Sequence, residues 1–269
     1  MKLRVLVDNN TIIDKYFVGE PALCFYIEED ERKILFDTGY SDVFLKNAED
    51  MGIDLSEIAD VVISHGHNDH TGGMEYLLNK NFKSKPRVVS HPMTFIEREA
   101  DGLSIGSPVN KIDVENKFKM ILTKEPTNIT DRLIFLGEIP TTHDFEKRKV
   151  VGKCLVDDLW EDDYVCDDSA LVYKGKEGIY IITGCSHSGI CNIISYARKV
   201  TGIDKVLGVI GGFHLFEKDD LTMKTIEYIK NTEIKEIYPC HCTAFGVKAE
   251  MSKHMDIKEI GVSTELEWR

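Results

Sequence analysis

The sequence predicts a layered α/β sandwich, and two observations carry this prediction. Strand-like runs alternate with helix-like runs over most of the chain, and they form two strand-rich groups that helices close. With 269 residues, 42% of them hydrophobic and 29% charged, the chain can bury a large globular core. No apolar run approaches the roughly 18 residues of a membrane span, so we expect no membrane partner.

The first strand-rich group lies in the N-terminal hundred residues. Strands are expected at residues 1–7, 23–28, 33–37, 60–64 and 87–90. Helices are expected at residues 41–51, 73–79 and 93–100. Ser41 can cap the first helix and Gly52 can end it, because glycine accepts the left-handed conformation that closes many helices.

The second strand-rich group lies in the C-terminal hundred residues. Strands are expected at residues 179–183, 205–210 and 234–238. Helices are expected at residues 189–199, 219–230 and 243–253. Acidic residues at the start of the second helix suit its positive N-terminal end.

Residues 101–168 interrupt the alternation between these groups. We interpret this stretch as an irregular elaboration on the main fold and not as a separate domain. Within it, residues 157–168 carry seven carboxylates and no lysine or arginine. Such a run of like charge is typical of a solvated loop.

Charge and cysteine content restrict the classes of partner and compartment. The net charge of −13 gives no electrostatic footprint for nucleic acid, so none is expected as a partner. The seven cysteines are odd in number and scattered, which argues against a disulfide scaffold and favours the cytoplasm. The N-terminus meets an aspartate at position 8, too early for a secretory signal.

The strongest functional pattern is a group of four potential metal ligands within six residues. His65, His67, Asp69 and His70 directly follow the strand expected at residues 60–64. Imidazole and carboxylate are the ligands of zinc, iron and manganese hydrolytic sites. Nearby glycines allow the backbone to turn tightly, so these side chains can converge on one point.

This segment resembles the His-x-His-x-Asp-His signature of the metallo-β-lactamase superfamily, and Asp37-Thr38-Gly39 resembles its upstream aspartate turn. The resemblance implies a four-layer αββα sandwich over residues 1–269, with one or two divalent metal ions at one edge of the two sheets. Zinc is the first expectation, with iron and manganese as alternatives. It also implies that His65 and His67 hold one metal, that Asp69 and His70 hold the other, and that Asp37 orients a ligand histidine.

The later part of the chain departs from the superfamily's common pattern. Cys185 stands after the strand at residues 179–183, where a bridging aspartate is expected, and His187 follows it. We favour His187 as the ligand with Cys185 buried, while a bridging thiolate remains the alternative. His241 is expected as the last ligand, and its neighbours Cys240 and Cys242 as small buried residues.

Three further histidines are candidates for the site. His91 and His214 follow strands, so they either face the substrate as proton carriers or are satisfied histidines of the core. His143 is a candidate for an additional ligand, although the glycine that usually precedes such a ligand is missing.

The segments Gly-Cys-Ser-His-Ser-Gly, Gly-Gly-Phe-His-Leu and Pro-Cys-His-Cys-Thr narrow the resemblance. They are similar to a subgroup described as dihydropteroate-synthase-like, or dihydropterin ribofuranosyl-aminobenzene phosphate synthase-related. The resemblance implies an enzyme, and we expect a hydrolase that uses metal-bound hydroxide on a phosphoester or similar small anionic substrate, with pterin- and nucleotide-related compounds as candidates.

In this hypothesis Asp69 orients the nucleophile, and His214 or His91 protonates the leaving group. An anionic substrate would also need cations, and five lie in or near the irregular stretch. Each of them could equally be an ordinary solvated surface charge: Arg98, Lys111, Lys117, Lys119 and Arg148.

Three alternatives stay open. A pterin-phosphate transferase or synthase would need a second substrate and would release pyrophosphate or a similar group. An iron-dependent redox enzyme would need a separate electron-transfer partner and would give a coloured preparation. A non-catalytic, metal-stabilised binding protein would retain metal without turnover.

Overall fold

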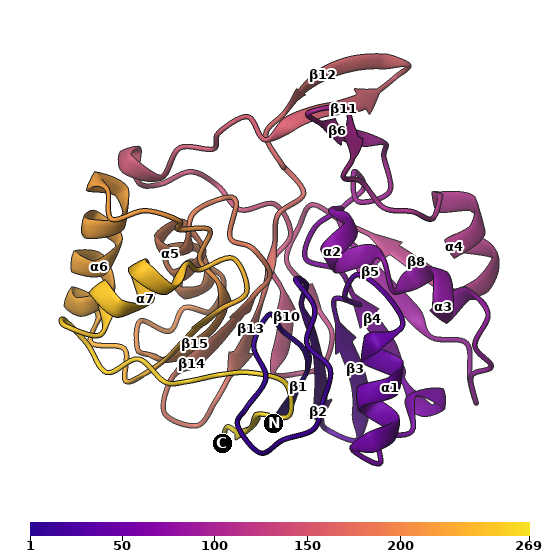
Figure 1. Cartoon of the computed structure of the whole chain (residues 1–269), viewed down its shortest axis with the longest axis horizontal. Coiled ribbons are helices and arrows are strands. Elements are labelled where there is room, and N and C mark those ends of the chain that lie inside the picture. The colour runs from indigo at the N-terminus through magenta and orange to yellow at the C-terminus, as the bar shows by residue number, and fades with distance from the viewer.

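The computed structural model describes residues 1–269 and is built around two facing sheets (Figure 1). The first sheet has the order β17-β1-β2-β3-β4-β5-β8. Its strands are β1 (Lys2–Val7), β2 (Cys24–Glu29), β3 (Arg32–Phe36), β4 (Asp60–Val62), β5 (Arg87–Ser90), β8 (Lys119–Leu122) and β17 (Glu265–Glu267). From β3 to β8 neighbouring strands are parallel, so their carboxyl ends share one edge of the sheet.

The second sheet has the order β16-β15-β14-β13-β10-β9. Its strands are β9 (Thr127–Asn128), β10 (Leu133–Phe135), β13 (Ala170–Lys174), β14 (Ile179–Thr183), β15 (Val206–Gly212) and β16 (Glu236–Cys240). The pairs β14–β15 and β15–β16 are parallel, so this sheet also collects strand ends at one edge.

Helices cover the outer face of each sheet. On the first sheet lie α1 (Val43–Asp50), α2 (Asn68–Thr71), α3 (Met74–Leu78) and α4 (Lys111–Lys117), with the short 3₁₀ turn η1 (Leu55–Glu57) between α1 and β4. On the second lie α5 (Ile190–Thr201), α6 (Asp220–Thr232) and α7 (Phe245–Met251). The layers are therefore αββα, which confirms the predicted fold. None of the helices combines the length and apolar composition of a membrane span.

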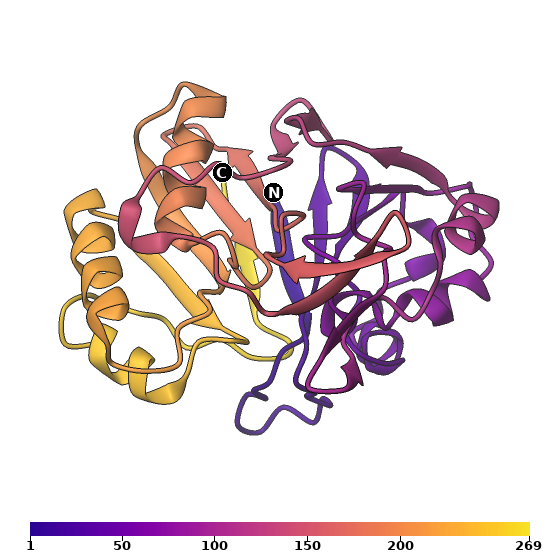
Figure 2. The ribbon, with the colours of Figure 1, turned by 90° about the horizontal axis from the view of Figure 1, so that it is seen from above.

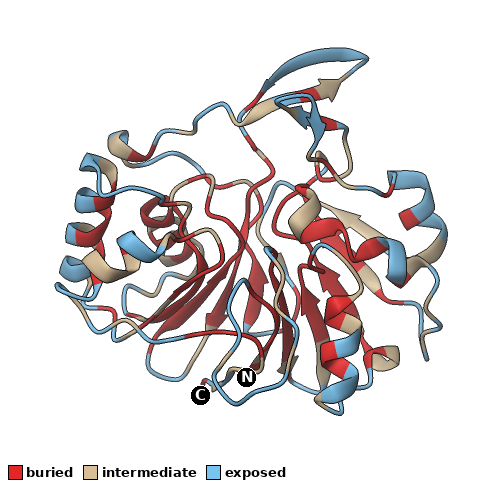
Figure 3. Ribbon diagram, viewed as in Figure 1, coloured by how far each residue is buried: buried red, intermediate tan, exposed pale blue.

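Three apolar clusters follow from this layering. Side chains such as Phe25, Phe36, Phe135 and Ile182 fill the space between the two sheets. Two further clusters join each sheet to its outer helices. The central strands of both sheets are accordingly buried along most of their length, while the helices expose one face (Figure 3).

A third, smaller sheet stands above the strand ends. It consists of β6 (Arg98–Ala100), β7 (Leu103–Ser104), β11 (Gly152–Val156) and β12 (Leu159–Asp163), in the order β12-β11-β6-β7. Seen from above, the β11–β12 hairpin crosses the middle of the molecule (Figure 2). Residues 101–168 are thus more regular than expected, since they also supply β8, β9 and β10 as edge strands of the main sheets.

Two local predictions are wrong. The helix expected at residues 93–100 is a turn followed by β6, because Arg98 pairs with Cys154 of β11 and its guanidinium binds two buried carboxylates. The acidic run at residues 157–168 is not a solvated loop throughout. Asp163, Asp167 and Asp168 are at most 1% exposed, because each accepts hydrogen bonds in the interior.

Most other predicted elements are confirmed, with small shifts at their ends. β5 and β14 have the predicted bounds. α1 begins two residues later than predicted, and Gly52 follows it with a φ of 69°, as expected of a glycine that ends a helix. α7 is shorter than the predicted helix at residues 243–253.

Candidate metal centre

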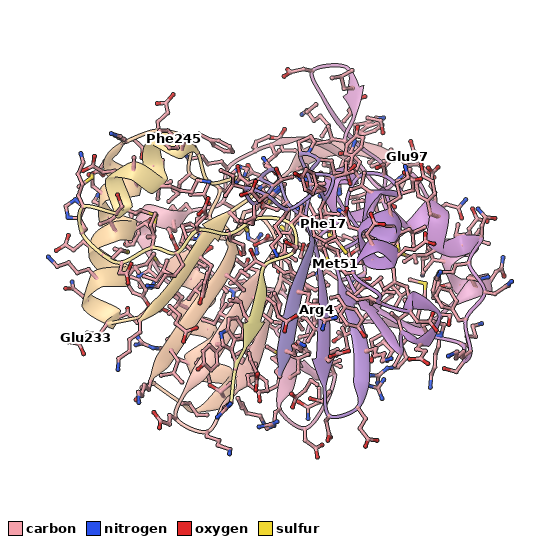
Figure 4. All side chains as sticks on the ribbon, turned by 60° about the horizontal axis from the view of Figure 1, so that its bottom comes forward. Arg4, Phe17, Met51, Glu97, Glu233 and Phe245 are labelled. Atoms are coloured by element: carbon pink, nitrogen blue, oxygen red, sulfur yellow. The ribbon has the colours of Figure 1, made fainter.

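The parallel strands of both sheets end at one place, and this topology assembles the site. Asp37 follows β3, His65 lies just beyond β4, Cys185 lies beyond β14, and His241 follows β16. Figure 4 shows Phe245, at the start of α7, and Glu97, just before β6, on opposite halves of this end of the molecule.

Four residues near these strand ends adopt left-handed backbone conformations that non-glycine residues rarely take. The φ angles are 59° at Asp37, 58° at Ser186, 50° at His214 and 49° at His241. Such conformations cost on the order of 1–3 kcal/mol each and persist where the surrounding fold enforces them. The sharp turns direct the side chains across the strand ends instead of along the strands.

The first part of the cluster contains His65, His67 and His187. His65 Nε2 lies 3.1 Å from His67 Nδ1. The ring centroid of His187 lies 4.8 Å from that of His65 and 4.9 Å from that of His67. Three rings therefore surround one point between the two sheets.

The second part contains Asp69, His70 and His241. Asp69 Oδ2 lies 3.4 Å from His70 Nε2 and 3.2 Å from His241 Nε2. Burial disfavours the charged carboxylate, but His70 and His241 outweigh this effect and hold the pKa of Asp69 well below its usual range. The carboxylate is therefore ionised at neutral pH.

Cys185 lies between the two parts. Its Sγ is within 4.8 Å of donor atoms of His65 and His187, and equally of Asp69, His70 and His241. The sequence left Cys185 and His187 as alternatives, and the structure brings both to the cluster.

Cys242 joins the other side of Cys185. Its Sγ is within 4.8 Å of Cys185 Sγ and of a ring nitrogen of His214, and it accepts a hydrogen bond from the His214 N–H at 3.3 Å. Cys240, in contrast, is fully buried as expected. Cys242 was expected to be a small buried residue, but it is partly exposed at the edge of the cluster.

Asp37 accepts hydrogen bonds from His70 and from the backbone just before His65. Its Oδ2 accepts a hydrogen bond from His70 Nδ1 at 2.7 Å, while Oδ1 accepts one from the Ser64 N–H at 2.7 Å. The opposite nitrogen of His70 consequently faces Cys185 Sγ at 3.2 Å.

His241 is oriented by two residues that sequence reasoning missed. Asp8 Oδ1 accepts a hydrogen bond from the His241 N–H at 3.0 Å, and Asn9 Oδ1 lies 3.1 Å from His241 Nδ1. Both residues follow β1, which no local pattern connects with the C-terminal histidine.

A buried ion-pair network holds the loop that carries His65 and His67. The Gly66 N–H donates to Asp167 Oδ2 at 2.7 Å, and Arg98 Nη2 donates to Asp167 Oδ1 at 2.7 Å. Arg98 Nη1 also donates to Asp163 at 2.8 Å. Arg98 was proposed from the sequence as a cation for the substrate. It is only 1% exposed, and it instead supports the loop that carries His65 and His67.

Two of the histidines considered as candidates from the sequence lie outside the cluster. His91 Nδ1 accepts a hydrogen bond from the Met93 N–H at 3.2 Å, and its Nε2 lies 3.3 Å from Glu138. This arrangement matches the satisfied histidine of the core, not the expected catalytic position. His143 lies 2.8 Å from Ser195 Oγ and contacts Tyr228, so it does not supply an additional ligand.

The donor atoms fit divalent metal ions. Burial and neighbouring histidines hold the pKa values of His65 and His187 well below the usual value, and burial, with Arg98 nearby, lowers the pKa of His67 to about 4. Metal binding requires such neutral imidazoles. His67 Nε2 and His187 Nε2 are also buried without a hydrogen-bond partner in the protein, which costs about 1–3 kcal/mol each unless a ligand compensates.

A cavity of about 270 Å³ adjoins the cluster at His187 and His214. Lys147 and Lys149, which precede β11, also line it. Of the cations proposed from the sequence, none lines this cavity. Lys111, for example, lies 3.5 Å from Glu115 on its own helix.

Comparisons with known proteins agree with this architecture. A family model described as the metallo-beta-lactamase superfamily matches residues 18–146. A protein of Methanocaldococcus jannaschii described as uncharacterized is 31% identical over 93% of this chain and 94% of its own length. A second protein of that organism, named 7,8-dihydropterin-6-methyl-4-(beta-D-ribofuranosyl)-aminobenzene-5'-phosphate synthase, is 31% identical over 96% of this chain and 92% of its own length.

A solved structure is similar over nearly the whole chain. It is that of Tm1679, described as a metal-dependent hydrolase of the beta-lactamase superfamily, with 29% identity and a TM-score of 0.85. The match covers 99% of this chain and 98% of the other.

Proposed function

The chain belongs to the metallo-β-lactamase superfamily, and from that premise we propose that it is a metal-dependent hydrolase of phosphoesters or similar small anionic substrates. The observation that carries the proposal is the cluster of imidazole nitrogens around one ionised carboxylate, with His67 Nε2 and His187 Nε2 buried and unpartnered, at the joint edge of two sheets. Pterin- and nucleotide-related phosphoesters are the first candidates.

Two groups of residues would hold the metals. His65, His67 and His187 would hold one ion, and Asp69, His70 and His241 the other, with Cys185 within reach of both. Zinc is the first candidate, because it takes nitrogen, sulfur and carboxylate ligands together. When bound, such an ion would lower the pKa of water to about 7 and polarise a phosphoryl oxygen.

In this proposal the chain's own residues position the attacking water and protonate the leaving group. Asp69, whose side chain is 26% exposed, accepts a hydrogen bond from the attacking water and orients it. His214 presents Nδ1 without a partner in the protein, 4.2 Å between ring centroids from His187, and donates a proton to the leaving oxygen. Lys147 and Lys149 attract an anionic substrate to this edge.

The seven cysteines, all unpaired, support a reducing compartment, and we propose the cytoplasm.

Metal analysis with a screen of phosphomonoesters and phosphodiesters tests the hydrolase proposal. We expect one or two divalent ions per chain and a loss of at least about a hundredfold in kcat/KM for Asp69→Ala. His143→Ala, outside the cluster, is the control and should retain activity. Fully metallated protein that cleaves none of the esters would overturn the proposal.

A synthase acting on a dihydropterin phosphate is the second candidate, because one relative at 31% identity carries that name. Such a reaction consumes a second substrate and releases pyrophosphate or a similar group. Incubation with a dihydropterin phosphate, with and without an aminobenzene-type acceptor, separates the two reactions. Release that depends on the acceptor favours the synthase.

A further inference from the structure

We propose that the cavity beside His187 and His214 binds an aromatic ring of the substrate, so that the substrate class is an aryl or heteroaryl phosphoester. This inference rests on the proposed function, because it places the phosphoryl group at the metal centre. His187 and His214 line the cavity and also belong to the cluster, so the cavity adjoins the place where the phosphoryl group would bind.

The cavity has the size and the walls that a ring requires. Its volume is about 270 Å³, and five of its twelve lining residues are hydrophobic. Val150 and Val151 form one side, from the segment before β11. Leu215 and Leu221 form the other, from the loop after β15 and the start of α6. Apolar side chains from two separate segments therefore face a common space, as in sites that bind flat organic groups.

One lining residue of the cavity, Val150, and one neighbour of its lining residues, Phe216, are exposed apolar side chains. Val150 is 47% exposed and Phe216 is 58% exposed. The Phe216 ring meets the His214 ring edge-on, with centroids 4.8 Å apart. An exposed aromatic ring beside a functional histidine gains stabilisation when another ring covers it.

The two lysines that line the cavity favour binding of an anionic aromatic compound over a neutral one. Lys149 makes no ion pair, and Lys147 approaches only Asp144, at 3.9 Å, with both side chains highly exposed. The one carboxylate lining the cavity, Glu146, is occupied, because it accepts hydrogen bonds from the N–H groups of Cys191 and Asn192 at 3.1 and 2.9 Å. The cavity is therefore lined by two exposed lysines, of which Lys149 makes no ion pair and Lys147 makes only a long, solvated one.

Paired phosphonates test this inference without depending on turnover. Phenylphosphonate and methylphosphonate carry the same anion and differ only in the ring. Calorimetric titration of zinc-loaded protein should give phenylphosphonate at least about tenfold tighter binding, because the ring buries on the order of 100 Å² of apolar surface.

Three variants test whether the preference for the ring arises in the cavity. Val151→Trp should fill the cavity and reduce the ratio of the two affinities to within about twofold while methylphosphonate still binds. Retained methylphosphonate binding shows that this variant folds. Leu159→Trp, at the exposed tip of the β11–β12 hairpin, is the matched control and should keep the ratio. Lys149→Ala should weaken both phosphonates by a similar factor.

The outcomes separate this inference from the proposed function. Equal affinities for the two phosphonates, or no binding of either, overturn the cavity inference. A ratio that survives in Val151→Trp overturns it as well. If phenylphosphonate binds at least about tenfold more tightly than methylphosphonate but the protein cleaves no phosphoester, the cavity inference is supported and the hydrolase proposal is contradicted.

Discussion

Asp37 shows how much of the site depends on one residue's geometry. Its left-handed backbone turns the carboxylate back toward β4, where it accepts hydrogen bonds from Ser64 and His70. Both oxygens are thereby used, and His70 is left with one nitrogen facing the cluster. A ligand histidine fixed in this way loses little conformational freedom when it binds metal.

Asp167 should matter for metal affinity although it is no ligand. Asp167→Asn removes the charge that pairs with Arg98 and weakens the bond to the Gly66 N–H, so the loop of His65 and His67 loosens. We expect metal affinity to fall about 10- to 100-fold, measured by competition with a chelating dye. Asp162→Asn is the control, because Asp162 pairs with Lys153 on the exposed hairpin. Equal affinities in both variants would contradict this role.

Cys185 and His187 can be separated by metal substitution. We expect His187→Ala to lose at least about tenfold in metal affinity and Cys185→Ser to lose less, since His187 completes the group of three histidines. In cobalt-loaded protein, a thiolate-to-cobalt absorption band that disappears in Cys185→Ser would instead identify the thiolate as a ligand. Cys166→Ser, outside the cluster, should leave the spectrum unchanged.

The stability of the metal-free protein should depend on the charge of His67. Its pKa falls from 6.5 to about 4 on folding, so between these values the unfolded chain binds more protons than the folded one. Stability is therefore complete above pH 6.5 and decreases as the pH falls toward 4, by about 3 kcal/mol for this residue. Urea unfolding with a chelator present, across this pH range, measures the effect. His67→Gln should flatten the dependence, and an unchanged slope would refute it.

At the scale of elements, α5 depends on a carboxylate from outside the helix. Gly189 provides no side-chain cap, and Glu146, from the 3₁₀ turn η2 (Asp144–Glu146), accepts from the N–H groups of Cys191 and Asn192. A Cβ at Gly189 would clash with Glu146 Oε2, so glycine there permits the contact. The segment that carries Lys147 and Lys149 is thereby fixed beside His187.

Glu146→Ala should accordingly destabilise the fold. The loss of two hydrogen bonds at a helix start predicts a decrease of about 1–2 kcal/mol in the free energy of unfolding. Chemical unfolding with metal present measures it. Asp144→Ala, two residues away and fully exposed, should change stability by less than about 0.5 kcal/mol. A similar loss in both variants would show that the turn as a whole, not the cap, is responsible.

At one place, tertiary contacts give a segment a different secondary structure from the one its local sequence predicts. Residues 93–100 have a helical pattern, yet β6 forms there because Arg98 gains two buried carboxylate partners from a segment over sixty residues later. The buried ion pairs of Arg98 therefore favour the strand conformation of β6.

At the scale of the whole molecule, the cluster brings together residues from two halves of the chain. His65, His67, Asp69 and His70 come from the first sheet, and His187 and His241 from the second. We therefore expect a metal bound to both sides of the sandwich to stabilise the packing of the sheets as well as the loops.

Removal of metal should lower the melting temperature of the whole protein. A metal present at a hundred times its dissociation constant contributes about 2.7 kcal/mol, so chelation should shift the transition down by several degrees. Differential scanning calorimetry with and without chelator measures the shift. The shift should vanish in His65→Ala and persist in His143→Ala. A shift of equal size in both variants would mean that the chelator acts elsewhere.

The sequence by itself determined the alternation of elements, the superfamily and the main donors, because strand periodicity and the His-x-His-x-Asp-His spacing are local properties. It could not determine that His91 and His143 lie apart from the cluster, that Asp8 and Asn9 orient His241, or that Arg98 and Asp167 support the metal loop. These pairings join residues far apart in the chain, and a charged residue has the same local pattern whether it is solvated or buried. Only the packing of the two sheets and the outer hairpin brings such partners together and decides which charges are removed from water.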